Sequence, residues 1–210
     1  FNPEKIIICW EGGGSPRRRA IFPEYKKNRK PVRLNRSKIY EDLPDTVENY
    51  SDQVEMTIEF LSNIPVNQVY ARDCEADDII GYVTKNMFKE DEIIIASSDK
   101  DFYQLLEADR IKQYSPATKK IITESDVLDQ YNITVENFVT ARALIGDPSD
   151  GIAGIKGCGF KTLAKRFPEL SETGFVSVND IINKSNKLCE GKSLKLYKSI
   201  SESPDLLKRN

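Results

Sequence analysis

The chain of 210 residues is 39% hydrophobic and 30% charged with a formal net charge of −2, which allows one fair-sized domain or a domain with a small appendage. Histidine is absent, which excludes Ser-His-Asp and Cys-His catalysis and most zinc hydrolase designs. The four cysteines contain no C-x-x-C pair, so we expect a reducing, cytoplasmic setting without a disulfide framework. No apolar run reaches the roughly 18 residues of a membrane span, so no membrane contact is expected.

The first residues, FNPEKIIICW, predict a short buried strand at 5–9 that ends in a glycine-rich loop at 11–14. The apolar run of this segment is too short for a signal peptide. Because the sequence has no initiator Met, we expect that the natural chain begins earlier.

A strongly basic stretch, 16–38, follows this loop and carries a net charge of +9, with Glu24 as its single acidic residue. Phe22 and Tyr25 are interleaved with the basic side chains, which favours a surface for a polyanion. A solvated surface face explains such a stretch as well, so both interpretations stay open. The basic residues are Arg17, Arg18, Arg19, Lys26, Lys27, Arg29, Lys30, Arg33, Arg36 and Lys38.

The middle of the chain alternates between predicted strands and helices. Helical spacing predicts helices within 46–61 and at about 77–88, and an amphipathic helix start follows the strand expected at 93–96. A weaker strand is expected at 67–71, and a strand pair at 111–115 and 119–123. The fold class expected from this alternation is α/β, a three-layer core with a mainly parallel sheet.

The last third of the chain has a different character. A helix is expected at 134–146 with Thr134 as its N-cap, then a glycine-rich turn, a second helix and a small helical tail. We therefore divide the chain into an α/β core at 1–130, which includes a basic region at 16–50, a helix–turn–helix region at 131–170 and a tail at 171–210.

Acidic residues gather in DCEADDIIGY (73–82), in SSDKD (97–101) and in GDPSD (146–150). Helix starts, caps and turns explain each group taken alone. Two of the groups lie at strand-to-helix junctions, where ligand sites form in parallel sheets, and carboxylates gathered there require a counter-charge. Oxygen-only ligands point to Mg²⁺ or Mn²⁺, and two such ions can cleave a phosphodiester. The candidate ligands are Glu75, Asp77, Asp78, Asp99, Asp101, Asp147 and Asp150.

The glycine-rich segment GIAGIKGCGFKT (151–162) is not a P-loop, because Phe160 separates Gly159 from Lys161 and no strand precedes it. A glycine-rich turn that opens a helix directs backbone N–H groups at an anion. With Lys156, Lys161 and Lys165 nearby, we expect a nucleic-acid phosphate there; a tight turn between packed helices is the alternative.

Four ordered segments together resemble the flap endonuclease/5′-3′ exonuclease family: RRRAIFPEYKKNR, CEADDIIGYV, SSDKDFYQLL and LIGDPSDGIAGIKGCGFKTLA. The similarity covers roughly residues 5–167 and is greatest to bacteriophage 5′ nucleases and the 5′-nuclease domain of bacterial DNA polymerase I. It implies a PIN/5′-nuclease-like fold with a helical arch at about 26–50 and a helix–turn–helix (H3TH) element. It also implies a Mg²⁺-dependent phosphodiester hydrolase that acts in replication or repair.

The resemblance also implies roles for single residues. Glu75, Asp77 and Asp78 would hold the catalytic ion, and the acids at 99, 101, 147 and 150 the second ion. Lys26, Arg29 and Arg18 would hold the scissile phosphate. A K⁺ ion would bind backbone carbonyls at the H3TH turn. Residues in contact with DNA would be Arg17, Arg19, Tyr25, Lys27, Lys30, Gly154, Lys156, Gly157, Gly159, Lys161 and Thr162.

Two departures from the family pattern concern metal ligands. Family members begin with an additional strand that carries a ligand Asp, and this sequence starts after it. Where the family closes its next strand with Asp, this chain has CWEGGG, so Glu11 is the expected substitute; a one-residue shift of the loop would instead put Trp10 at this position.

The function expected from these observations is that of a structure-selective 5′ nuclease in a bacterial or phage-infected cell. Its partners would be branched or 5′-ended DNA, or an RNA·DNA hybrid, bound by a monomer. The alternative is a catalytically incomplete branched-DNA-binding module of the same fold. An RNA-cutting PIN nuclease is a third interpretation, which the glycine-rich element at 151–162 disfavours.

Overall fold

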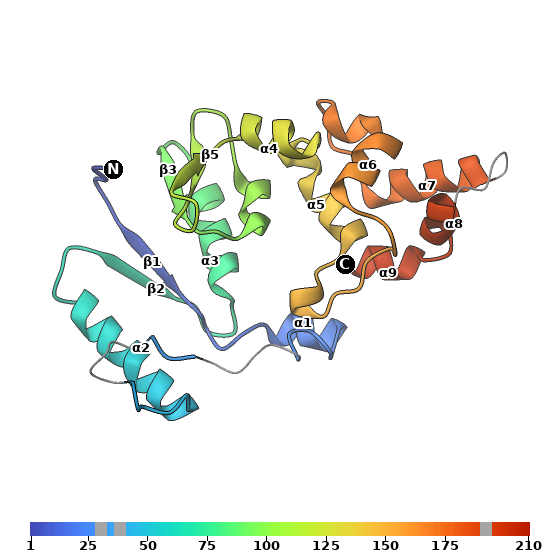
Figure 1. Ribbon diagram of the computed structural model, residues 1–210. Helices are drawn as coiled ribbons and strands as arrows, with labels where there is room; N and C mark the ends of the chain where they lie inside the picture. The colour runs from blue at the N-terminus through green and yellow to red at the C-terminus, as the bar shows by residue number, and fades with distance from the viewer. Residues whose placement is uncertain (28–32, 36–40, 190–194) are drawn as a thin grey trace.

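The computed structural model describes residues 1–27, 33–35, 41–189 and 195–210 (Figure 1). The strands are β1 (Ile7–Trp10), β2 (Asn67–Tyr70), β3 (Ile93–Ala96), β4 (Ile111–Ser115) and β5 (Lys120–Ile122). The α-helices are α1 (Pro16–Ile21), α2 (Val47–Leu61), α3 (Ala76–Tyr82), α4 (Glu124–Tyr131), α5 (Val135–Ile145), α6 (Phe160–Arg166), α7 (Val178–Cys189), α8 (Lys195–Ser201) and α9 (Pro204–Arg209). A π-helix (Val83–Met87) and 3-10 helices (Lys100–Leu105, Pro148–Asp150 and Pro168–Ser171) complete the described elements.

The strands form two sheets within the described ranges. In one, β1 pairs in parallel with β2; in the other, β4 pairs in parallel with β3 and antiparallel with β5. The expected α/β class and the dominance of parallel pairing are confirmed. The expectation of one continuous sheet is wrong for these residues, because β1 and β3 belong to different sheets.

Side-chain caps fix the start of several helices. The hydroxyl of Thr46 accepts a hydrogen bond from the Asn49 N–H at the start of α2, and Thr134 does the same for Asn137 in α5. The helix at 46–61, the strand at 93–96 and the helix capped by Thr134 therefore lie where the sequence predicts them. Two helices, α1 and α4, were not expected.

Two expected α-helices are irregular. The helix at 77–88 is α-helical to Tyr82 and then continues as the π-helix, at the point where the Thr84 hydroxyl donates to the carbonyls of Ile80 and Gly81. After β3 the chain forms a 3-10 helix rather than an α-helix, with Asp99 as its N-cap.

Two apolar clusters stabilise the fold. One joins β3, β4 and the 3-10 helix at 100–105 to α4 and to Phe138 of α5; the other packs α5 to α9 together. Tyr131 and Phe160 pack against both clusters, with ring centroids 4.6 Å apart. The division of the chain at 130 and 170 stays a prediction.

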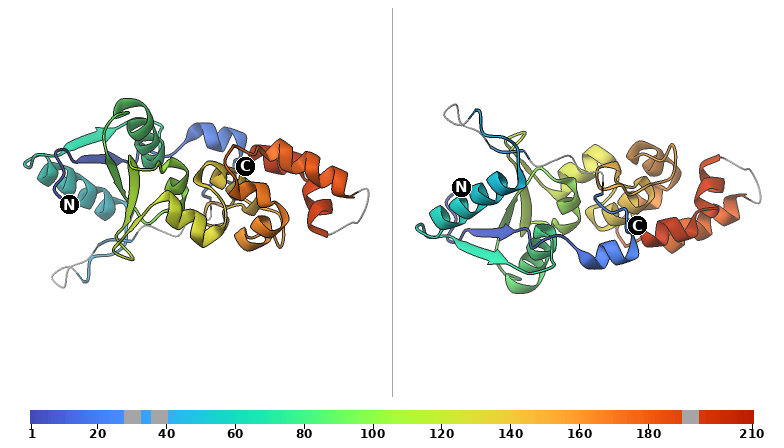
Figure 2. Two further views of the ribbon diagram at one scale, coloured as in Figure 1. Left: turned by 90° about the horizontal axis from the view of Figure 1, so that it is seen from above. Right: turned by 90° about the horizontal axis from the view of Figure 1, so that it is seen from below.

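The arrangement is elongated. Helices α6–α9 lie at one end, β1, β2 and α2 lie at the other, and the second sheet and α5 lie between them (Figure 1, Figure 2). Helix α1 lies beside the end of α9, where the Arg209 guanidinium is 4.2 Å from the centroid of the Phe22 ring. Among the described helices, none has the length and apolar character needed to cross a bilayer.

Candidate metal and nucleic-acid site

Glu75 is the most buried of the candidate ligands, with 2% of its surface exposed. It is the N-cap of α3, and the Asp78 carboxylate accepts a hydrogen bond from its backbone N–H, so the helix-start interpretation of this acidic group is confirmed. The Glu75 carboxylate also receives a hydrogen bond from Tyr25 at 3.0 Å and lies 2.7 Å from Nζ of Lys26. Burial and the Glu75 carboxylate both raise the pKa of Tyr25, so this phenol stays neutral and donates.

Helix α1 delivers a guanidinium to the same acidic group. Ser15 caps α1 by accepting a hydrogen bond from the Arg18 backbone N–H. The Arg18 side chain binds both oxygens of Asp78, at 2.7 and 2.8 Å, and lies 3.3 Å from Glu75. The hydrogen bonds from Arg18 lower the pKa of Asp78, so this carboxylate stays ionised.

Backbone contacts place Lys26 against the turn at 148–150. Its N–H donates to the carbonyl of Asp150 at 2.9 Å, and its φ of 58° turns the chain there. Nζ of Lys26 lies 4.0 Å from Oδ2 of Asp150, so this ammonium is shared between two predicted ligand groups.

Asp77 lies in an environment that disfavours its negative charge. The packing around it and the nearby charges of Asp99, Glu11 and Glu75 raise its pKa to about 6, against the opposing effect of Lys26. Its side chain is nevertheless exposed at the surface, and it has no hydrogen bond or ion pair within the described residues. An ion could therefore reach Asp77 from solvent and would relieve the repulsion.

A second group consists of Asp99, Asp101 and Asp147. Asp99 accepts a hydrogen bond from the Asp101 N–H at 2.9 Å. Arg142 of α5 lies between the other two, with Nε 2.7 Å from Asp101 and Nη2 2.8 Å from Asp147. Burial raises the pKa of Asp101 despite Arg142, whereas hydrogen bonds from Ser149 and the Arg142 charge outweigh burial and lower that of Asp147.

The acids therefore lie in two groups, and the charge of Asp99 in one group acts on Asp77 in the other and raises its pKa. Over the described ranges, no three carboxylates or thiols already surround a point where a metal ion could bind. The seven predicted ligands are thus not gathered into one ready metal site among the described residues, and Arg18, Lys26 and Arg142 bind oxygens of several of them. The donor set of carboxylate oxygens still fits a hard divalent cation, since Asp77 and Glu11 have no hydrogen bond to any residue that the structure describes.

The glycine-rich turn packs closely against α5. A Cβ on Gly154 would lie 1.9 Å from the carbonyl oxygen of Ile145, and Gly157 has a φ of 78°, so both positions require glycine. Lys156 and Lys161 are exposed near the start of α6, which begins after Gly159, and Thr162 is half-buried. Because α5, not a strand, precedes this turn, the exclusion of a P-loop is confirmed.

The basic segment is only partly described. Arg17, Arg19 and Lys27 are exposed, whereas Tyr25 is buried against Glu75. Arg29 and Lys30 lie outside the described residues, as does much of the predicted arch, so their predicted roles stay predictions.

Sequence reasoning missed two residues that organise the second acidic group. Arg142 is a single cation on an otherwise largely apolar helix, which was the one signal available. Gln113 is fully buried on β4 and donates to the carbonyls of Ser97 and Asp99, at 2.7 and 2.8 Å, while its own oxygen has no hydrogen-bond partner in the described part of the chain. It holds the loop that carries Asp99, and nothing in the sequence pattern marks it.

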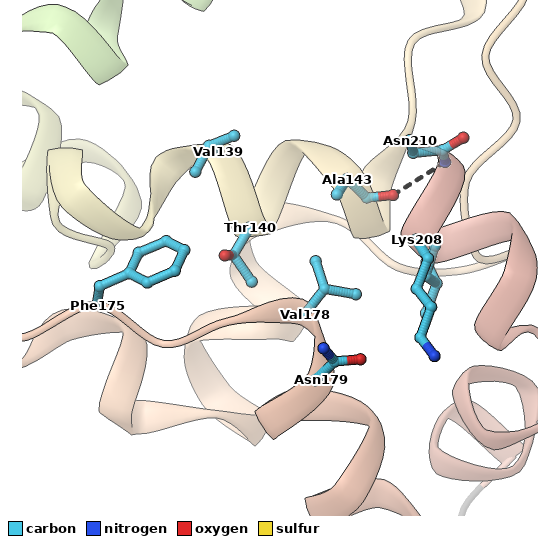
Figure 3. A pocket seen from close by; sticks show the side chains of 9 residues that line it. Val139, Thr140, Ala143, Phe175, Val178, Asn179, Lys208 and Asn210 are labelled. Atoms are coloured by element: carbon cyan, nitrogen blue, oxygen red, sulfur yellow. Dashed lines mark hydrogen bonds between the residues drawn. The ribbon is translucent and has the colours of Figure 1, made fainter. Parts of the chain in front are cut away.

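A cavity of about 280 Å³ lies away from these acids, between α5, α7 and α9 (Figure 3). Val139, Thr140 and Phe175 line one part of it, and Lys208 and Asn210 another. Of the predicted site residues that the structure describes, none lines this cavity.

Comparison with known proteins places this geometry in context. The family described as "5'-3' exonuclease, N-terminal resolvase-like domain" matches residues 1–132. A 5'-3' exonuclease of Buchnera aphidicola subsp. Schizaphis graminum is 31% identical over 81% of this chain and 55% of its own length. A flap endonuclease Xni of Shewanella sp. (strain MR-4) is 28% identical over 92% of this chain and 70% of its own.

Solved structures agree with these sequence matches. The T5 D15 protein, co-crystallised with metal ions, has a TM-score of 0.78 and 26% identity over 98% of this chain and 73% of its own. The catalytic core of Rad2, solved in complex with a DNA substrate, has a TM-score of 0.53 at 16% identity, over 97% of this chain and 57% of its own, and supports the fold alone. The chain spans about half the length of the Buchnera relatives it matches. Because the family match covers more than half of the sequence, this chain belongs to the 5′-3′ exonuclease family, in its N-terminal resolvase-like domain.

Proposed function

We propose that this chain is a structure-selective 5′ nuclease, which cuts branched or 5′-ended DNA with two Mg²⁺ or Mn²⁺ ions. The observation that carries the proposal is the Glu75–Asp77–Asp78 group, which is bordered by Lys26 and Arg18 and in which the charge of Asp99 acts on Asp77. Metal-dependent phosphodiester hydrolysis needs carboxylates that can bind a cation, next to positively charged side chains that can bind a phosphate.

In this proposal the acidic residues bind the metal ions and the basic residues bind the phosphate. Divalent ions, when bound, activate water and stabilise the leaving oxygen. Glu75, Asp77 and Glu11 would offer oxygens to one ion, and Asp99, Asp101, Asp147 and Asp150 to the other. Lys26 and Arg18 are placed to exchange their carboxylate partners for the scissile phosphate and its developing charge. Such a cut leaves a 5′-phosphate and a 3′-hydroxyl.

The glycine-rich turn supports binding of the duplex next to the cut. Lys156 and Lys161 are exposed and have no ion pair within the described ranges, so both can contact backbone phosphates. The proposal extends to a K⁺ ion at this turn, to RNA·DNA hybrids as substrates, and to a monomer in the cytoplasm. The relatives named as flap endonucleases and 5'-3' exonucleases support the substrate class.

The assay that tests this proposal uses a duplex with a 5′-labelled flap, incubated with the chain in Mg²⁺ or in EDTA. We expect cleavage near the branch in Mg²⁺ and none in EDTA. Cleavage that continues in EDTA would overturn the requirement for metal.

The second candidate function is that of a branched-DNA-binding module. The ion pairs that the acids make with basic side chains favour it. Arg18, Lys26 and Arg142 already form ion pairs with Glu75, Asp78, Asp101 and Asp147, so three positive charges offset part of the acidic charge without metal. Tight flap binding without cleavage in Mg²⁺ would select this candidate. Cleavage under the same conditions would reject it.

A further inference from the structure

The second acidic group contains an internal cation. This inference rests on the proposed nuclease function and concerns Arg142 of α5, which was not among the predicted site residues. One edge of its guanidinium holds two carboxylates from different segments: Nε lies 2.7 Å from Oδ1 of Asp101, and Nη2 lies 2.8 Å from Oδ2 of Asp147. Its side chain is 25% exposed.

The guanidinium of Arg142 lies between two carboxylates, as a bound metal ion would. A guanidinium stays charged at every accessible pH and presents donors in a fixed plane, so it can bridge two carboxylates as a divalent cation would. Its Nη1 also contacts the Gly146 carbonyl, at 3.4 Å, at the end of its own helix. The oxygens that face Arg142 cannot bind a metal on that same side while these hydrogen bonds persist.

The first acidic group differs in one respect. Asp77 has no hydrogen bond or ion pair from any described side chain, although Lys26 and Arg18 bind its neighbours. An ion at Asp77 therefore displaces no hydrogen bond of that carboxylate, whereas an ion between Asp101 and Asp147 must displace Arg142.

We propose that Arg142 is a built-in competitor for the second metal position, and that it sets the affinity and the order of metal binding. The ion beside Asp77 binds first. The second ion binds only when Arg142 releases Asp101 and Asp147. Arg142 is thus a positioning residue that acts through these two carboxylates.

The test is a titration of the metal-free chain with Mn²⁺, in which free Mn²⁺ is followed by EPR without DNA. In the wild type we expect one tighter and one weaker class of site. Arg142→Gln should tighten the weaker class about tenfold, because a competing charge is gone. Arg142→Lys, which keeps the charge but cannot bridge both acids, should lie between the two.

Matched variants separate this effect from a general change in charge. Lys184 on α7 forms an ion pair of similar length, 2.7 Å, with Glu169. Lys184→Gln removes this positive charge and should leave the affinities of both classes of Mn²⁺ site unchanged. In an Asp101→Asn/Asp147→Asn background, Arg142→Gln should lose its effect, because the two sites couple through these acids.

The possible results distinguish failure of the competition by Arg142 from failure of the nuclease proposal. Equal or weaker Mn²⁺ binding in Arg142→Gln would overturn the competition while leaving the nuclease proposal in place. Absence of Mn²⁺ binding in the wild type would overturn both. If Arg142→Gln does not fold, the competition can be tested in the wild type by NMR. The signal to follow is the Nε–Hε signal of Arg142, which is assigned by its loss in Arg142→Lys. It should shift as Mg²⁺ saturates the weaker class, and an unchanged signal would overturn the inference.

Discussion

Nζ of Lys26 lies 2.7 Å from Oε2 of Glu75, and both side chains are almost withdrawn from solvent, at 10% and 3% exposure. This pair joins the basic segment after α1 to the start of α3, about fifty residues further along the chain. A charge pair so little exposed stabilises the metal-free site only while both partners remain, because an unpaired buried carboxylate is costly.

The first prediction concerns the removal of this ammonium. Lys26→Met should lower the free energy of unfolding of the metal-free chain by about 1–3 kcal/mol, less than for a fully isolated buried charge, because Arg18 and Tyr25 still contact Glu75. Urea denaturation in EDTA measures the change. Lys27→Met is the control: its side chain is 63% exposed, and it should cost less than about 0.5 kcal/mol. Equal stability of the two variants would contradict the pair's importance.

The raised pKa of Asp77, about 6, predicts a pH dependence of stability. Because the folded chain binds this proton more tightly than the unfolded chain, ionised Asp77 weakens the fold above pH 6, and the penalty disappears as pH falls toward about 4. Asp77→Asn should therefore be more stable than wild type at pH 7.5, by less than about 1 kcal/mol because the side chain is exposed, and equal near pH 4.

Thermal melts of the metal-free chain between pH 4 and pH 8 measure this difference. Asp126→Asn should change stability in the opposite direction and destabilise the chain at neutral pH. Hydrogen bonds from Thr123 lower the pKa of Asp126, so its charge stabilises the fold at this pH. A pH-independent difference between wild type and Asp77→Asn would show that the neighbouring acids do not act on Asp77.

Close packing at the glycine-rich turn predicts a difference between two glycines. Gly154→Ala should destabilise the chain by several kcal/mol or prevent folding, because the new Cβ would lie 1.9 Å from the Ile145 oxygen, which is backbone and cannot move aside. Gly81→Ala, in α3 with open space around the added atom, should be neutral or stabilise by about 0.5–1 kcal/mol. Melting temperatures of the two variants test this, and a stable Gly154→Ala chain would disprove the close contact.

Salt dependence tests the contact of Lys161 with DNA. Lys161→Gln should weaken flap binding by a similar factor for every sequence, and it should reduce the slope of log K against log salt by about 1. Lys198→Gln, a change at a similarly exposed lysine on α8, should leave the slope unchanged. Fluorescence anisotropy with labelled DNA at several salt concentrations measures both. An unchanged slope for Lys161→Gln would place this lysine outside the DNA contact.

The sequence revealed those parts of the fold that depend on local pattern. The strand at 93–96 was located from its apolar run, the helix at 46–61 from its apolar spacing, and the cap at Thr134 from the preference of hydroxyls for helix N-caps. The separation into two sheets and the π-helix after Tyr82 depend on contacts between distant segments, which periodicity does not encode.

The same distinction holds for the site. Acids at strand ends were visible as a pattern, and Asp77 and Asp99 do interact. Their cationic partners were only partly visible, because Arg18 and Lys26 belong to an evident basic stretch, whereas Arg142 is a lone charge whose role follows from how α5 packs. Gln113 was not recognisable, because a buried glutamine resembles any other polar residue in a strand.

The proposed function requires that the acids of the two groups hold the metal used for cleavage. The most direct measurement is single-turnover cleavage of a 5′ flap in Mg²⁺ by Asp99→Asn/Asp101→Asn, beside Asp126→Asn/Asp180→Asn, which removes two acids that cap helices elsewhere. Loss of cleavage in the first variant, with flap binding retained and full cleavage in the second, is the predicted result. Wild-type cleavage rates in Asp99→Asn/Asp101→Asn would contradict the account.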